Sequence, residues 1–182
     1  MNNKILLEVL DWIKTFAIAF VCVYLINLFL FSLATVNGQS MEPTLQHKQW
    51  LISSKISYIF GEPQRGDIVV LKNPYHDGTS DEKYFVKRVI GVPGDEIKIE
   101  NQHVILNGEV LNEPYTDKLI EGEFNDVVVV PEGEYFVMGD NRGLMRSTDS
   151  RYFGTLEKDD IVGKIKAVIW PIKDFNWFGK GE

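Results

Sequence analysis

The sequence is poor in the residues that most often hold metals or form disulfides. Its 182 residues include one cysteine, Cys22, and three widely separated histidines, His47, His76 and His103. A single cysteine excludes an intrachain disulfide and a cysteine-based zinc site, and the histidines lack HxxxH spacing. Chemistry must therefore come from hydroxyls, carboxylates and amines, and we predict no metal and no cofactor.

Basic residues are outnumbered by acidic ones. The chain has 19 lysines and arginines against 26 aspartates and glutamates, a formal net charge of −7. An acidic chain has no electrostatic footprint for a phosphate backbone, so no nucleic-acid partner is expected. Seven prolines and 15 glycines exclude a low-complexity or collagen-like chain.

Charged residues are absent from one long segment, Thr15 to Ala34, in which apolar side chains predominate. A helix of about 20 residues is about 30 Å long, the thickness of a bilayer's hydrocarbon core. We therefore predict a transmembrane anchor over 15–35, a cytoplasmic N-terminus over 1–14 and an extracytoplasmic domain over 36–182. The lipid bilayer is thus an expected partner.

Flanking charge predicts the orientation of this segment. Lys4 and Lys14 precede it and the next basic residue is Lys48, which favours a cytoplasmic N-terminus in a single-pass membrane protein. The alternative is a cleavable secretory signal, because Ser32-Leu33-Ala34 has the small-x-small pattern that precedes cleavage. The aromatic-rich tail Ile169–Phe178 either packs on the core or rests at the lipid interface, and both interpretations stay open.

Beyond Val36 the pattern is that of β-strands. Short β-branched or aromatic runs are separated by Gly, Pro, Asn and Asp, which predicts strands over 67–71, 84–90, 96–100, 103–106, 127–130, 135–138 and 161–170. Asn107-Gly108 predicts a two-residue hairpin turn, and Asp77-Gly78 a longer exposed connection. We expect a mainly β domain with an antiparallel β-sheet and one N-terminal transmembrane helix.

Ser40, in the segment Gly38–Thr44, is the first candidate for chemistry. A reactive serine needs an exposed hydroxyl and a backbone that can turn N–H groups toward developing negative charge. The segment is compatible with that role, although a serine in such a loop is more often a turn residue. It is not the hydrolase elbow, because Glu42 stands where that motif requires glycine.

Lys87 is the candidate base. Strand alternation places Phe85, Lys87 and Val89 on one face, so the amine shares its face with apolar neighbours. Desolvation disfavours the ammonium form and lowers the pKa of a lysine, which makes the amine available as a base. The alternative is a lysine whose amine reaches solvent from a strand edge.

Four charged residues of alternating sign follow within twelve positions: Asp140, Arg142, Asp149 and Arg151. Such a cluster either fixes a loop through charge-assisted hydrogen bonds or forms a solvated surface that contributes little. Ser147 lies between the two pairs.

Taken in order, these segments resemble bacterial type I signal peptidases, membrane-anchored serine proteases that remove signal peptides from exported preproteins. The blocks that carry the resemblance follow the apolar run and are Gly38-Gln-Ser-Met-Glu-Pro-Thr-Leu45, Arg65-Gly-Asp-Ile-Val-Val70, Tyr84–Asp95, Gly139-Asp-Asn-Arg142 and Ser147-Thr-Asp-Ser-Arg151. The resemblance implies a β-rich fold and signal peptides as substrates. The single anchor is similar to that of Gram-positive members, which implies the bacterial cell membrane.

The resemblance also implies roles for individual residues. Ser40 would be the nucleophile and Lys87 the general base of a Ser-Lys dyad. Ser147 matches the hydroxyl that orients the lysine amine, and the charged residues that match the loop-holding positions are Asp140, Arg142, Asp149 and Arg151.

The chain departs from the family's pattern at two places. Four residues, Gly143–Arg146, separate the Gly-Asp-Asn-Arg block from Ser147, where the family usually has two. Some relatives carry a hydroxyl two residues before the nucleophile as an oxyanion donor, and this chain has Gly38 there. A second donor beside the Ser40 N–H is therefore backbone or unidentified.

Two other functions remain as alternatives. An exported, non-catalytic β-domain that binds a partner would have a leader ending at Ala34 and a mature chain beginning at Thr35. Self-cleaving repressors also pair serine with lysine, but they carry a DNA-binding segment where this chain has an apolar run.

Overall fold

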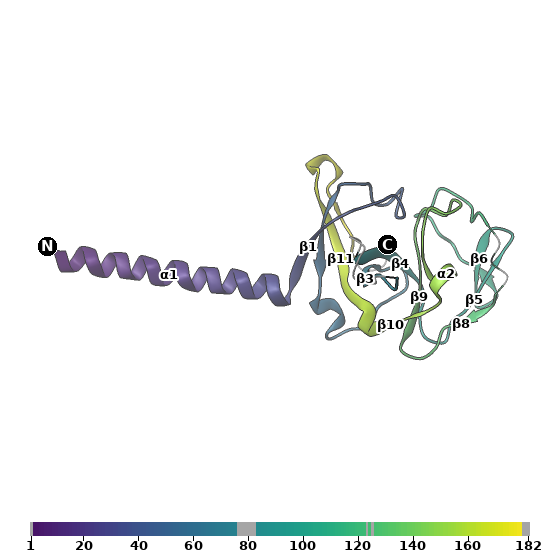
Figure 1. Ribbon diagram of the computed structural model, residues 1–182, viewed down its shortest axis with the longest axis horizontal. Coiled ribbons are helices and arrows are strands. Elements are labelled where there is room, and N and C mark those ends of the chain that lie inside the picture. The colour runs from purple at the N-terminus through teal and green to yellow at the C-terminus, as the bar shows by residue number, and fades with distance from the viewer. Residues whose placement is uncertain (1, 76–82, 123, 125, 180–182) are drawn as a thin grey trace.

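The computed structural model describes residues 2–75, 83–122, 124 and 126–179, and Figure 1 shows a long helix followed by a β-rich body. The described strand pairs are antiparallel, so the mainly β, antiparallel fold expected from the sequence is confirmed. The connection predicted at Asp77-Gly78 lies outside the described residues.

A large sheet forms one part of the body. Its strands run in the order β1-β2-β11-β3-β4-β9-β10, and β12 also pairs with β11. The bounds are β1 Phe31–Thr35, β2 Trp50–Ser54, β3 Ile68–Lys72, β4 Tyr84–Gly91, β9 Glu134–Met138, β10 Leu156–Glu157, β11 Ile161–Trp170 and β12 Asn176–Trp177. The central strand β3 is buried over Ile68–Leu71, which fits its continuous β-branched and leucine run.

A smaller sheet lies beside the first, with strand order β7-β6-β5-β8 (Figure 1). Its strands are β5 Glu96–Glu100, β6 His103–Leu106, β7 Glu109–Val110 and β8 Val128–Val129. The predicted hairpin turn is confirmed: Asn107 and Gly108 join β6 to β7 with φ values of 52° and 86°. Positive φ at both central residues is what the tight hairpin turn requires.

Short helical segments complete the body: η1 Ile56–Tyr58, α2 Ser150–Phe153, η2 Lys158–Asp160 and η3 Ile172–Asp174. Buried side chains form three apolar clusters, one around Leu51 and Ile165, one around Val69 and Val137, and one around Ile97 and Phe136. The last cluster joins the small sheet to β9 of the large one.

Helix α1, Asn2–Phe29, extends away from the body (Figure 1), and its side chains are described from residue 4 to residue 24. Within those described residues, no helix has both the length and the apolar character needed to cross a membrane. The helix also ends earlier than the predicted range of 15–35. Phe31–Thr35 form strand β1, because every residue of this stretch pairs with β2, which satisfies the backbone groups on that side of the strand.

This strand bears on the alternative of a cleaved leader. Ala34 lies inside β1, opposite Leu51, and the Leu30 carbonyl accepts the Lys55 N–H at 3.0 Å. A leader that ended at Ala34 would therefore remove most of an edge strand from the folded domain.

The aromatic tail packs on the body in part, and its contact with the lipid interface stays a prediction. β12 pairs with β11, and Phe178 packs against the apolar cluster around Leu51. Trp170, Phe175 and Trp177 are exposed.

Candidate active site

The loop between β1 and β2 positions Ser40. Met41 and Leu45, which follow the serine in the sequence, are fully buried, and the Leu45 N–H donates to the Met41 carbonyl at 2.8 Å. Gly38 has φ 98°, a conformation that favours glycine. The loop is therefore anchored by apolar burial after Ser40 and turned by a glycine before it, which leaves the Ser40 side chain half-buried.

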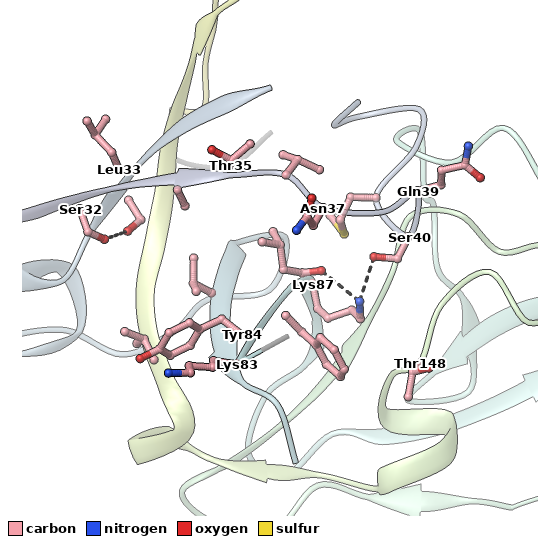
Figure 2. Close-up of a pocket in the computed structure, with 18 of the residues that line it drawn as sticks. Ser32, Leu33, Thr35, Asn37, Gln39, Ser40, Lys83, Tyr84, Lys87 and Thr148 are labelled. Atoms are coloured by element: carbon pink, nitrogen blue, oxygen red, sulfur yellow. Dashed lines mark hydrogen bonds between the residues drawn. The ribbon is translucent and has the colours of Figure 1, made fainter. Parts of the chain in front are cut away.

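Lys87 reaches the same point from the middle of β4. Its side chain is 3% exposed, and its Nζ donates to Ser40 Oγ at 2.9 Å and to the Val86 carbonyl at 3.2 Å. The Phe85 ring centroid lies 5.0 Å from Nζ. Figure 2 shows the amine between the two oxygens, facing the serine. The two residues that the sequence selected for chemistry, 47 positions apart, are thus in direct contact.

A cleft of about 660 Å³ surrounds this contact. Its walls come from β1, from the Ser40 loop and from the first half of β4 (Figure 2). Apolar side chains of the lining are Leu33, Ala34, Val36, Met41, Val70, Phe85, Val86 and Val162. β1 is an edge strand, and β4 pairs with β9 only from Arg88 onward. An extended peptide therefore has backbone to pair with on either side of the cleft.

Asp149 and Arg151 hold the loop that follows β9. Asp149 caps α2, accepts the Gly139 N–H at 3.1 Å and binds Arg151 through two contacts of 2.8 and 2.9 Å. Burial by itself raises the pKa of Asp149, but the hydrogen bonds and charge of Arg151 prevail and hold it below the usual value. Asp149 is therefore a buried, ionised anchor for the loop.

Ser147 lies where this loop meets the nucleophile. Its hydroxyl is buried and has no hydrogen-bond partner of good geometry in the described part of the chain, although it adds to the lowering of the pKa of Asp149. Gly139 separates it from the nucleophile loop: a Cβ on Gly139 would lie 2.3 Å from both Ser147 Oγ and the Ser40 carbonyl oxygen. The proposed contact of Ser147 with the lysine amine stays a prediction.

Asp140 links the strand that carries Lys87 to the loop that carries Ser40. It binds Arg88, the neighbour of Lys87, through two contacts of 2.8 and 2.7 Å, and it accepts the Thr44 hydroxyl at 2.5 Å. The Asn141 N–H also donates to the Ser40 carbonyl at 3.0 Å. Strand, nucleophile loop and charged loop are therefore joined by a buried, charge-assisted network.

Arg142 is paired with a residue that the sequence did not indicate. Its side chain is fully buried and forms a two-pronged ion pair with Glu113, at 2.9 and 2.5 Å, while Nε donates to the Gly139 carbonyl at 2.8 Å. Tyr115 donates to the same Glu113 and stacks under Arg88, 3.9 Å from its guanidinium. The Glu113 ion pair raises the pKa of Arg142 although burial opposes this.

The four predicted loop residues thus do not form one cluster. Asp149 and Arg151 pair with each other, whereas Asp140 pairs with Arg88 and Arg142 with Glu113. Arg88 carried a local signal, since it adjoins Lys87 in a predicted strand. The Glu113 segment has no pattern in the sequence. Among the described residues, no group of three His, Cys, Asp or Glu side chains is arranged to hold a metal ion.

Comparison with known proteins agrees with the resemblance seen in the motifs. The model of a family described as signal peptidase, peptidase S26, matches residues 9–170. The chain belongs to this signal peptidase family. All seven residues singled out above lie within the matched range.

Curated relatives extend the likeness to nearly the whole chain. Signal peptidase IB of Staphylococcus aureus strain MRSA252 is 34% identical over 187 residues, covering 93% of this chain and 94% of that protein. Signal peptidase I P of Bacillus subtilis subsp. natto is 39% identical and covers 91% of each. A crystal structure of a signal peptidase I from Enterococcus faecalis V583 is 31% identical, covers 57% of this chain and 96% of that one, and has a TM-score of 0.45.

Proposed function

We propose that this chain is a membrane-bound serine endopeptidase that removes N-terminal signal peptides from exported preproteins with a Ser-Lys dyad. The observation that carries the proposal is the 2.9 Å contact between Lys87 Nζ and Ser40 Oγ, with the amine buried and the pair open to a cleft. A nucleophile within hydrogen-bond reach of a desolvated base is the geometry that acyl transfer needs.

The reaction follows from this geometry. Neutral Lys87 takes the proton of Ser40 as Oγ attacks the carbonyl carbon of the scissile peptide bond. The Ser40 N–H stabilises the oxyanion, and Lys87 then gives its proton to the leaving amine of the mature protein. Water attacks the acyl-enzyme by the same route and restores Ser40.

Gly38 does not complete the oxyanion site. It has no hydroxyl, and its N–H donates to His47 Nδ1 at 3.2 Å. A second donor must come from another group at the cleft or from water.

The substrate lies extended across the cleft. Its backbone pairs with β1 on one side and with the open half of β4 on the other, and the apolar lining around Ala34 and Val86 accepts small side chains. The charged network behind the site contributes rigidity, because productive attack requires the carbonyl carbon to lie about 3–3.5 Å from Oγ.

The membrane part of the proposal rests on the uncharged stretch of α1 from Thr15 to Phe29 and on the direction of α1, which leads away from the body. The helix joins β1 at Phe31, and Ser32–Thr35 line the cleft. An anchor attached there keeps Ser40 near the bilayer surface, where a membrane-inserted preprotein presents its cleavage site. The N-terminus is then cytoplasmic and the catalytic domain extracytoplasmic.

Incubation of a purified preprotein with the full-length chain tests the proposal. We expect the wild type to release a mature protein with one new N-terminus, and Ser40→Ala and Lys87→Met to release none while retaining the wild-type melting temperature. Lys87→Arg is the matched variant that keeps the charge, and we expect it to be inactive because a guanidinium does not give up its proton. Cleavage by a folded Lys87→Met enzyme would remove the proposed base.

A further inference from the structure

The four-residue segment before Ser147, two residues longer than is usual in the family, places an arginine at the cleft. Gly143–Arg146 form a turn in which the Arg146 N–H donates to the Gly143 carbonyl at 3.2 Å. The Leu144 N–H is held by a Glu121 carboxylate oxygen at 2.8 Å, and Met145 is 86% exposed. The turn is therefore pinned on its outer side, and Arg146 lines the cleft together with Thr148.

The charge of Arg146 is not neutralised within the described residues. Its guanidinium donates to Gln39 Oε1 at 3.4 Å, and the ion pairs of the described chain do not include it. Lys83 also lines the cleft, and no carboxylate does so among its described lining residues. In a chain with a formal net charge of −7, this local excess of positive charge favours an anionic group in the bound substrate.

The direction of the cleft tells which part of the substrate Arg146 faces. Figure 2 shows Ser32 and Leu33 at one end and Gln39 and Thr148 at the other, with Ser40 nearer the second end. Helix α1 enters the body beside the first end, at Phe31, so a membrane-inserted signal peptide reaches the cleft from that side. Gln39, the partner of Arg146, lies at the opposite end, where the chain after the scissile bond leaves.

We propose that Arg146 is a specificity-determining residue that favours preproteins with Asp or Glu among the first residues after the cleavage site. This inference rests on the proposed function. A carboxylate there would replace the long, neutral contact to Gln39 with a charge-assisted hydrogen bond, for which the guanidinium fork is well suited. The interaction is formed at the rim of the cleft, so salt weakens it.

Matched soluble peptides test this inference with the full-length chain in detergent. One peptide carries Glu at the second position after the cleavage site, and its partner carries Gln. We expect wild-type kcat/KM to be about fivefold higher for the Glu peptide at low salt, a ratio typical of one partly exposed ion pair. In Arg146→Gln the ratio should fall to about one, and in Arg146→Glu a Lys peptide should become the preferred substrate.

Lys118→Gln is the control, because it removes an exposed positive charge outside the cleft and should leave the ratio at its wild-type value. Equal cleavage of both peptides by the wild type, or an unchanged ratio in Arg146→Gln, overturns the inference and leaves the proposed function intact. The inference is also overturned if the Glu-to-Gln ratio is one for wild type and variants alike while Arg146→Gln loses binding to vesicles containing anionic lipid. In that case the arginine binds lipid instead of substrate. Failure of the wild type to cleave either peptide would instead refute the proposed function.

Discussion

Gly139 separates the Ser147 hydroxyl from the carbonyl of Ser40, with no room for a side chain between them. A Cβ built on Gly139 would lie 2.3 Å from each of the two oxygens, and one of these belongs to backbone that cannot rotate away. The glycine lets the loop after β9 approach the nucleophile loop, and the Asn141 N–H fastens the two at the Ser40 carbonyl. The position of the nucleophile thus depends on a residue that takes no part in the chemistry.

We therefore expect Gly139→Ala to impair both activity and stability. The added methyl group forces the two loops apart, which costs about 1–3 kcal/mol of folding free energy by overpacking. A displacement of Ser40 by about 1 Å lowers kcat by about 100-fold. Steady-state kinetics and thermal unfolding of the same preparation measure both effects. Gly179→Ala, where no heavy atom lies within 4 Å of the added Cβ, is the control, and equal activity of the two variants would contradict the expectation.

Ser147→Ala should separate catalysis from folding. The hydroxyl is buried and has no hydrogen-bond partner of good geometry among the described residues, so its removal should change the melting temperature little. If the hydroxyl orients the lysine amine once substrate is bound, kcat falls by about 10-fold to 1,000-fold.

Ser150→Ala is the matched control for this variant. The Ser150 hydroxyl accepts the Val137 N–H at 2.9 Å, and its loss leaves a buried donor unpaired at a cost of about 1–3 kcal/mol. We expect Ser150→Ala to melt earlier and keep its kcat, the reverse of Ser147→Ala. Full activity in Ser147→Ala would assign the hydroxyl a packing role only.

Acid stability should report on Asp149. Its pKa is lowered in the folded protein, chiefly by Arg151 acting against burial, so the unfolded chain binds more protons near pH 4. The stabilisation is complete above the unfolded pKa of about 3.9 and is lost as the pH falls through the lower folded value. The free energy of unfolding of the wild type should therefore exceed that of Asp149→Asn by about 3–5 kcal/mol at pH 7. This difference should become smaller below about pH 4.

Urea unfolding between pH 3 and pH 7 measures this gap. Asp117→Asn removes an exposed carboxylate and should give a curve parallel to wild type. A gap that stays constant down to pH 3 would show that Asp149 does not contribute through its charge.

Local patterns predicted much of this fold because they act over a few residues. The predicted strands over 96–100, 103–106 and 161–170 match β5, β6 and β11. A β-branched run bounded by turn residues depends only on residues that are close together in the sequence. Strand β1 was not predicted, because its apolar residues continue the uncharged run of α1. Only pairing with β2, which lies fifteen and more residues further along the chain, distinguishes the two.

The residues of the candidate site likewise differ in how far local sequence predicted them. Ser40 and Lys87 were candidates on local grounds but were selected by the order of the motifs along the chain, and the structure brings them into contact. The ion pairs that hold the site in place were harder to predict, because Arg142 pairs with Glu113, which lies in a segment without periodicity or motif. A buried ion pair of this kind depends on tertiary placement, and no spacing rule within one loop identifies its partner.

The boundary between α1 and β1 gives the proposed anchor its own test. Deletion of residues 1–29 leaves Leu30, which accepts the Lys55 N–H, and all of β1 in the sheet. We expect this truncated enzyme to fold and to cleave soluble peptides at close to the wild-type rate, but to process membrane-inserted preproteins far more slowly. The reason is that confinement to one surface, rather than the dyad, has been removed.

Deletion of residues 1–35 should behave differently, because it also removes β1 and one wall of the cleft. That variant should lose peptide cleavage and melt earlier, since the backbone groups of β2 that pair with β1 are exposed. Rates on a soluble peptide and on a preprotein in liposomes, measured for both deletions, distinguish anchoring from folding. Equal losses on the two substrates after deletion of 1–29 would contradict a role for the helix in bringing enzyme and preprotein to one membrane.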